Sequence, residues 1–182
     1  MDKNKISEII RVDHAGEYGA RYIYHGQIKA FDLKKDYESK SLVSEMKTHE
    51  DEHFEYFAKK ITEKRVRPTI MTPIWKIGGF ALGFATAMLD KKAAMACTTA
   101  VEEVIDDHYQ EQLNEIEDVQ INKDNKKELS ELKKKITKFR EDEIHHRDIG
   151  YENKADEYKH FSSLSSFIKV ITKTAIAISK KV

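Results

Sequence analysis

Two four-residue motifs of the form Glu-x-x-His constrain this chain more than any other feature of its sequence. They are Glu50-x-x-His53, in KTHEDEHFEYF, and Glu143-x-x-His146, in FREDEIHHRDIG. Residues three apart lie on one face of an α-helix, so each motif presents a carboxylate and an imidazole in the same direction. In both segments that face also carries apolar residues, which predicts that the motifs point into a protein core.

Large apolar side chains share the face of each motif. They are Val43, Met46, Phe54 and Phe57 beside Glu50, and Leu129, Leu132, Ile136 and Phe139 beside Glu143. A third pair with this spacing, Glu157 and His160, follows Gly150 and Asn153 on its own face and is predicted to lie on the surface. Because a buried carboxylate without a partner is costly, the two inward pairs require either a shared cation or ion pairs with lysine or arginine.

Helical spacing of apolar residues dominates the rest of the chain, and only two prolines and seven glycines interrupt it. The expected helices are residues 7–33, 37–64, 73–89, 92–117, 126–160 and 162–180, with breaks at RVRPT, Asp90 and IEDVQINKDN. We therefore predict an all-α fold. The longer helices form a four-helix bundle, and the segments 73–89 and 162–180 add two amphiphilic helices.

Each of the two remaining long helices supplies one more inward carboxylate. In the first helix, Glu17 shares a face with Ile10 and Tyr24. In the fourth, the choice lies between Glu102, whose face carries mainly apolar residues, and Glu103, whose face carries two aspartates and a glutamine. A carboxylate on an apolar face points inward, so we select Glu102.

The resulting set is Glu17, Glu50, His53, Glu102, Glu143 and His146. Its order along the chain is one Glu, then Glu-x-x-His, twice over, which is the ligand set of ferritin-like di-iron and di-manganese carboxylate proteins. Oxygen ligands with a few imidazoles suit iron or manganese better than copper, and the single cysteine, Cys97, cannot build a sulfur site. We predict one ferritin-like domain over residues 1–182 that holds two metal ions, in preference to buried salt bridges.

The charge balance argues against nucleic acid as a partner. The chain contains 32 basic and 32 acidic residues and so lacks the usual basic surplus. Cys97 alone cannot form an internal disulfide, which suits a reducing compartment. The N-terminal sequence MDKNKISEIIRVDHAG has neither an apolar signal core nor an arginine-rich presequence, so we expect no removed targeting segment.

Two segments are more apolar than the rest. TPIWKIGGFALGFATAMLD is short for a membrane crossing, and we interpret it either as a buried helix or as a helix in the membrane interface, with Trp75, Phe80 and Phe84 in the acyl boundary. The segment 162–180 carries an apolar stripe from Leu164 to Ile178; it docks on the bundle or lies on an anionic membrane.

Longer blocks around the selected residues resemble the demethoxyubiquinone hydroxylase family of ubiquinone biosynthesis. The blocks are RVDHAGEYGA, THEDEHF, RVRPT followed by GFALG, AMACTTAVEEVIDDHY and FREDEIHHRDIG. The resemblance runs from about Arg11 to the C-terminus. It departs from the family pattern at His145, where family members often have a carboxylate, and at Arg147, where they often have a histidine.

The resemblance implies a di-iron monooxygenase that uses O2 to hydroxylate the ring of a polyprenyl demethoxyquinol, of the 2-polyprenyl-3-methyl-6-methoxy-1,4-benzoquinol type. The family's metal ligands fall on the six residues already selected, with iron expected and manganese the alternative. A reductant, or the bound quinol itself, must supply two further electrons, since the chain lacks a nicotinamide or flavin fingerprint such as G-x-G-x-x-G; the external donor, if one is used, is unknown. A quinol substrate implies work at a membrane surface, next to other ubiquinone-biosynthesis proteins.

The absence of a presequence favours the cytoplasmic face of a bacterial inner membrane, with the matrix side of the mitochondrial inner membrane as the alternative for a trimmed chain. His108 and Tyr109, about two turns from Glu102, are candidates for a proton or electron relay, or else a core tyrosine and a partly exposed histidine. Glu141, Asp142 and His145 are expected to face water or to contact the ligands from behind, where His145 could orient one of them.

Three other functions compete with the hydroxylase. A ferritin-like iron oxidase would share the ligands but should be wholly soluble, and the nearly uncharged segment 73–89 disfavours it. A manganese catalase would decompose hydrogen peroxide and ignore quinols. A helical membrane-surface or partner-binding module would hold its buried acids in salt bridges and bind no metal.

Overall fold

The computed structural model describes residues 3–117 and 126–181. Its α-helices are α1 (Lys3–Lys34), α2 (Tyr37–Lys64), α3 (Thr72–Leu89), α4 (Lys91–Glu117), α5 (Lys126–Glu152) and α6 (Phe161–Ser179). No β-strand occurs in either described range, so the prediction of an all-α fold is confirmed. Most of the predicted IEDVQINKDN connection, residues 118–125, lies outside the described ranges.

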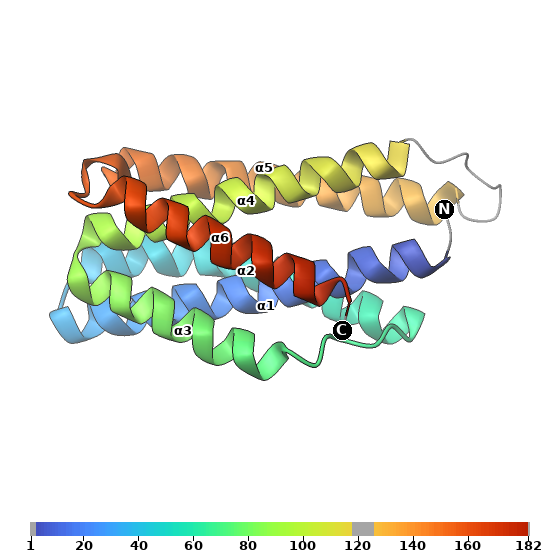
Figure 1. Cartoon of the computed structure of the whole chain (residues 1–182), viewed down its shortest axis with the longest axis horizontal. Coiled ribbons are helices and arrows are strands. Elements are labelled where there is room, and N and C mark those ends of the chain that lie inside the picture. Colours follow the sequence, from blue (N-terminus) through green and yellow to red (C-terminus); the bar gives the residue numbers. More distant parts are fainter. Residues whose placement is uncertain (1–2, 118–125, 182) are drawn as a thin grey trace.

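The four longest helices lie side by side, and the two shorter ones cover one face of the bundle (Figure 1). α1 packs against α2, and α4 packs against α5. Ion pairs such as Lys60 with Glu131, at 3.1 Å, join α2 to α5. α3 packs mainly on α1 and α6 mainly on α4, so both cover the face that α1 and α4 share.

Local sequence sets several helix ends close to their predicted positions. The Asp36 carboxylate begins α2 by accepting a hydrogen bond from the backbone N–H of Ser39 at 3.0 Å. Arg65 ends the same helix in a left-handed conformation, with φ of 51°. Pro73 lies in the first turn of α3, where its missing N–H removes no helical hydrogen bond.

The fifth helix was predicted too long. Residues 126–160 were expected to be continuous, but α5 ends at Glu152. Lys154 then takes a left-handed conformation with φ of 65°, and a short 3-10 helix (Ala155–Glu157) leads into α6. Ala155 is fully buried in this turn, so apolar spacing persists across it and periodicity alone joins the two segments.

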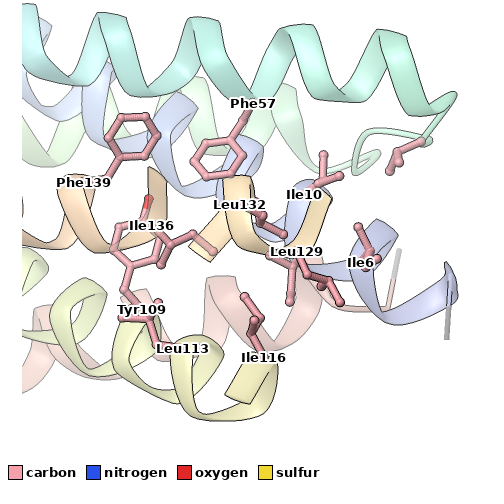
Figure 2. Packing of buried hydrophobic residues seen from close by; sticks show 12 residues of the cluster. Ile6, Ile10, Phe57, Tyr109, Leu113, Ile116, Leu129, Leu132, Ile136 and Phe139 are labelled. Atoms are coloured by element: carbon pink, nitrogen blue, oxygen red, sulfur yellow. The ribbon is translucent and has the colours of Figure 1, made fainter. Parts of the chain in front are cut away.

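Two apolar clusters fill the bundle. The first draws on α1, α2, α4 and α5 (Figure 2) and includes Ile10, Phe57, Tyr109, Ile136 and Phe139. The second includes Tyr24, Phe31, Val43, Met46 and Met95. On each of the four long helices the predicted site residues come between the residues that enter the two clusters. The site therefore lies between two close-packed apolar clusters, which exclude bulk water from it.

Glycines bring α3 against α1. A Cβ atom on Gly83 would lie 1.9 Å from the carbonyl oxygen of Ile23, and one on Gly26 would lie 2.2 Å from the carbonyl oxygen of Phe80. Any side chain at either position would force the helices apart. The two glycines therefore allow the backbones of α3 and α1 to pack in direct contact.

α6 is the one described helix that is long and apolar enough to cross a membrane by length and composition. In the structure it lies along α4, where Ile168 joins a buried cluster with Cys97 and Ala100. Lys169 also pairs with Glu103 of α4 at 2.5 Å. These contacts dock α6 on the bundle.

The face of α3 that was predicted to enter a membrane is turned inward. Trp75, Phe80 and Phe84 are all half-buried. Phe84 packs against the second apolar cluster and stacks on Phe80, and Trp75 Nε1 donates a hydrogen bond to Ser179 Oγ at 3.2 Å. The large apolar side chains that α3 and α6 expose around this region are Ile74, Ile77, Phe167, Val170 and Ile171.

Candidate metal centre

The six residues selected from the sequence meet inside the bundle. Glu17 comes from α1, Glu50 and His53 from α2, Glu102 from α4, and Glu143 and His146 from α5. Each is at most 3% exposed. Four helices therefore contribute one carboxylate each, and two of them add an imidazole, to one closed space.

Their ligand atoms fall into two groups. The first contains Glu17, Glu50, His53 and Glu143, the second Glu50, Glu102, Glu143 and His146, and in each group one atom per residue lies within 4.8 Å of the others. Glu50 and Glu143 belong to both groups. A carboxylate offers two oxygens, so Glu50 and Glu143 would each contribute to both metal positions, while Glu17 and Glu102 would each contribute to one.

Both histidines direct the same ring nitrogen at the carboxylates. His53 Nδ1 lies 3.1 Å from Glu143 Oε1 and 3.5 Å from Glu17 Oε2. His146 Nδ1 lies 3.2 Å from Glu50 Oε1 and 3.3 Å from Glu143 Oε2. Nδ1 is therefore the atom that each imidazole presents to the carboxylates, and Nε2 points away from the cluster.

Crowding of buried acids shifts the pKa values of the carboxyl groups. Burial, then the charge of Glu143, raises the pKa of Glu50 well above its ordinary value. Burial, then the charges of Glu143 and Glu50, does the same for the pKa of Glu102. Burial also pushes the pKa of Glu143 upward, but contacts with His146 and His53 outweigh burial and lower it.

The histidines become strong bases in this environment. Burial lowers the pKa of His53, but Glu143 and Glu17 outweigh burial and raise it to about 12. Burial likewise lowers the pKa of His146, but Glu143 and Glu50 raise it to about 11. In the absence of metal the cluster holds protons that offset its negative charge.

This donor set fits two divalent ions. Four carboxylates and two neutral imidazoles carry a charge that two such ions would neutralise, and hard oxygen donors with two nitrogens suit iron or manganese. His53 Nδ1 and Glu50 Oε1 are buried, and the atoms of Glu143 and His146 that lie 3.1 and 3.2 Å from them are not aligned for a hydrogen bond. Within the described ranges no lysine or arginine forms an ion pair with any of the four glutamates, so the salt-bridge alternative lacks its partners there.

Two tyrosines hydrogen-bond to Glu17 and Glu102, the glutamates that each belong to only one of the two groups. The Tyr109 hydroxyl donates a hydrogen bond to Glu17 Oε1, and the Tyr24 hydroxyl donates one to Glu102 Oε1 at 2.6 Å. Tyr109 was a sequence candidate for a role beside the site. Tyr24 was not, although its position two turns after Glu17 on the same inward face was the signal for it.

His108, the other relay candidate, does not point at the carboxylate cluster. It is buried, and its Nε2 lies 2.9 Å from Gln112 Nε2 and 3.6 Å from Asp13 Oδ1. Adjacent residues on a helix face about 100° apart, so Tyr109 reaches the site and its neighbour does not.

The outward nitrogens of the two histidines also have partners. His53 Nε2 lies 3.1 Å from Asp142 Oδ2, and His146 Nε2 lies 3.0 Å from His49 Nδ1. Asp142 was predicted to face water or to contact a ligand from behind, and it does the latter. His145, the alternative candidate for that place, is exposed. His49 was missed, because a residue next to a ligand in sequence gives no sign that it contacts the facing helix.

An apolar cavity of about 330 Å³ lies between α1, α3, α4 and α6. Gly16 and Gly19 of α1, Val101 of α4, Leu82 of α3 and Ile176 of α6 are among its lining residues. Gly16 and Val101 immediately precede Glu17 and Glu102 in sequence. The cavity thus lies on the α1–α4 side, whereas both histidines enter the site from the α2–α5 side.

Fold and site together define a class: helical-bundle proteins with a buried carboxylate–histidine cluster able to hold two metal ions. The model of the family described as ubiquinone biosynthesis protein COQ7 matches residues 4–179, and this chain belongs to that family. The family resemblance predicted from the sequence blocks is thereby confirmed.

Curated relatives cover nearly the whole chain. The chain is 48% identical over 182 residues to the mitochondrial NADPH-dependent 3-demethoxyubiquinone 3-hydroxylase of Dictyostelium discoideum, covering 100% of this chain and 80% of that protein. It is 42% identical over 177 residues to the 3-demethoxyubiquinol 3-hydroxylase of Rhodospirillum rubrum, covering 97% and 78% respectively. The human NADPH-dependent 3-demethoxyubiquinone 3-hydroxylase is 38% identical over 181 residues, with 100% and 80% covered. These relatives are hydroxylases, and this chain is an enzyme of that type.

Proposed function

We propose that this chain is one ferritin-like di-iron domain that hydroxylates the ring of a polyprenyl demethoxyquinol in ubiquinone biosynthesis. The observation that carries the proposal is a six-residue dimetal ligand set beside an apolar cavity of about 330 Å³. The names of the relatives indicate the substrate class, a demethoxylated ubiquinone precursor.

Glu17, Glu50, His53, Glu102, Glu143 and His146 would hold the ions, with Glu50 and Glu143 shared between them. Two iron ions bound there would supply the activation of O2 for insertion of one oxygen atom into the ring. The surrounding residues would exclude water from the metal site, because each proposed ligand is at most 3% exposed and apolar clusters lie on either side. Iron is favoured over manganese because the relatives are hydroxylases.

Tyr109 and Tyr24 would act on the substrate side of the site. They donate hydrogen bonds to Glu17 and Glu102, the two carboxylates carried by the helices that also line the cavity. Each hydrogen bond restrains one oxygen of a carboxylate and leaves the other free to bind an ion. The quinol ring would lie between this pair and the cavity, and the cavity would take the start of the isoprenoid tail.

The tail would enter from a membrane. The apolar side chains that α3 and α6 expose include Ile74, Ile77, Phe167, Val170 and Ile171, and two of these, Ile74 and Ile171, also line the cavity. Although α6 is long enough to span, its packing on α4 and the Lys169–Glu103 pair support a helix that lies in the interface. Bacterial and mitochondrial relatives both occur, and we place this chain peripherally on the cytoplasmic face of a bacterial inner membrane, or on the mitochondrial matrix side.

Besides the substrate ring and O2, the reaction needs two electrons from a donor. Ring C–H, O2, two electrons and two protons give ring C–OH and water. The name of the Dictyostelium relative indicates NADPH as the donor, and we propose the same source here.

The deciding experiment is mass spectrometry of the quinone product. Protein loaded anaerobically with ferrous iron receives a short-chain demethoxyquinol, NADPH and ¹⁸O-labelled O2. We expect one labelled oxygen in the ring, none with Glu143→Gln, and an unchanged yield with Glu157→Gln, whose Glu-x-x-His pair is exposed. An unlabelled ring from protein that carries two irons per chain would contradict the hydroxylase and favour a ferritin-like iron oxidase.

A second variant separates the cavity from the metal centre. Gly19 lines the cavity, and a Cβ atom there meets nothing within 4 Å, so Gly19→Leu places a side chain in the cavity without a close contact at its Cβ. We expect this variant to bind iron normally and to hydroxylate little quinol.

A further inference from the structure

Each ligand histidine is supported by the residue that immediately precedes the glutamate of the other motif. His53, from the α2 motif, contacts Asp142, which precedes Glu143 on α5. His146, from the α5 motif, contacts His49, which precedes Glu50 on α2. The contacts between the two Glu-x-x-His motifs are therefore reciprocal. The outer partners differ in chemistry, because His53 contacts a carboxylate and His146 contacts an imidazole.

The direction of both hydrogen bonds follows from metal binding. A histidine that gives Nδ1 to a metal keeps its proton on Nε2, so His53 donates to Asp142 and His146 donates to His49. His49 must then accept at Nδ1 and carry its own proton on Nε2. The rings of His49 and His146 are nearly parallel, with an interplanar angle of 12° and centroids 5.2 Å apart.

The two outer partners differ in charge. Asp142 is one-quarter exposed and its carboxylate lies 3.7 Å from Lys138 Nζ, which offsets part of its charge. His49 is half-buried, and among the described residues no acid forms an ion pair with it. A carboxylate behind a ligand imidazole increases the electron density that the imidazole gives to a metal, whereas a neutral imidazole does so less.

Resting on the dimetal centre proposed above, we propose that Asp142 and His49 are the positioning residues of the two ligand histidines, and that their different chemistry makes the two metal positions unequal. The position served by Glu17 and His53 binds a divalent ion more tightly than the position served by Glu102 and His146. His49 fixes the orientation of the His146 ring at the weaker position.

The chain offers a sharp test of this assignment at residue 49. The Nδ1 atom of histidine and the Oδ1 atom of aspartate or asparagine are both bonded to Cγ, so they occupy similar places. His49→Asn keeps a neutral acceptor for His146, His49→Asp replaces it with a carboxylate like Asp142, and His49→Leu removes it. His145→Leu, at an exposed histidine next to a ligand, is the matched control.

Metal-free protein is titrated with Co²⁺, followed by calorimetry and by the visible absorption of the bound ion, so that the readout is independent of turnover. We expect two unequal binding steps in the wild type and in His145→Leu. His49→Leu should weaken the second step by about 10- to 100-fold, His49→Asn should restore it, and Asp142→Leu should weaken the first step by a similar factor. His49→Asp should bring the two steps together.

The outcomes separate this inference from the proposed function. Two equal steps in the wild type, or the same second step in His49→Leu and His49→Asn, would overturn the unequal pair and the role of His49. Absence of Co²⁺ binding in the wild type would instead overturn the dimetal centre itself. Circular dichroism of each variant checks that it is folded. The Asn and Asp variants, which are nearly isosteric with each other, keep the test decisive if the Leu variant does not fold.

Discussion

Glu50 and Glu143 are the two carboxylates that belong to both ligand groups, one from each Glu-x-x-His motif and on helices that face each other across the bundle. Every other ligand belongs to one group only. Loss of Glu50 or Glu143 should therefore affect both proposed metal positions, whereas loss of Glu17 or Glu102 should affect only one.

This sharing predicts the metal content of single variants. Glu143→Gln should lose both ions, because it removes a ligand from each position, whereas Glu17→Gln should retain one ion per chain. Elemental analysis of protein loaded with ferrous iron and then desalted measures both ratios. Glu157→Gln, at an exposed motif, should keep two. Equal losses in the Glu143 and Glu17 variants would show that the groups do not define separate positions.

Metal binding should release protons near neutral pH. His53 and His146 have pKa values of about 12 and about 11 in the metal-free protein, and each must be neutral to bind an ion. Each ion therefore displaces at least one proton, and apparent affinity rises with pH. Calorimetry in two buffers with different ionisation enthalpies counts the protons. A count of zero at about pH 7 would contradict the protonated resting state.

The stability of the metal-free protein should fall as pH rises. The pKa of Glu102 is raised by burial, then by the charges of Glu143 and Glu50, so the folded chain retains a proton that the unfolded chain gives up above its ordinary value of 4.5. The histidine pKa values are raised too, so their contribution is full below 6.5 and is lost progressively as pH rises toward about 11 and about 12. The Glu102 and imidazole effects therefore have the same sign, whereas the lowered pKa of Glu143 acts in the opposite direction and only below its ordinary value of 4.5.

Glu102→Gln isolates the carboxylate contribution. The amide oxygen still accepts the Tyr24 hydrogen bond, but no charge has to be buried, so the variant should exceed the wild type in free energy of unfolding by on the order of 1–3 kcal/mol near pH 8. The gain should shrink toward pH 5. Chemical unfolding in the presence of a chelator measures this difference, and a gain that is the same at both pH values would exclude an origin in the Glu102 charge.

Packing of α3 on α1 should depend on Gly83 and not on Gly78. A Cβ atom on Gly83 would lie 1.9 Å from the Ile23 carbonyl oxygen, while one on Gly78 meets nothing within 4 Å. Gly83→Ala should lower the free energy of unfolding by about 1–3 kcal/mol, as overpacking does. Gly78→Ala should be neutral or raise it by up to about 1 kcal/mol through helix propensity. Thermal unfolding that affects both variants alike would contradict the close contact.

Membrane binding should depend on exposed side chains of α3 and α6 and not on the half-buried aromatic ones. The combined Ile77→Ser, Phe167→Ser and Val170→Ser variant should lose liposome flotation, since each side chain contributes roughly 1.5 kcal/mol or more when buried in lipid. A matched variant at Leu33 and Tyr37, exposed apolar residues outside α3 and α6, should float like the wild type. Flotation of both variants would place the membrane surface elsewhere.

The sequence by itself determined the fold class and which glutamates and histidines point inward. Both rest on local periodicity: residues three and four apart share a helix face, so a glutamate among apolar neighbours identifies its own direction. On that basis Glu102 was distinguished from Glu103, and in the structure Glu102 is buried whereas Glu103 pairs with Lys169 outside the site. Periodicity failed at the end of α5, where a left-handed Lys154 reverses the chain while apolar spacing continues.

Only the tertiary structure decided which side chains meet across helices. The contacts of His49 with His146, of Asp142 with His53 and of Tyr24 with Glu102 join residues from 78 to 97 positions apart in the chain. The inward turn of Phe84 and the outward turn of Ile77 likewise depend on how closely Gly83 lets α3 approach α1. A helix repeat fixes the direction of each side chain about its own axis, but the rotation and spacing of one helix against another depend on the packing of all of them together.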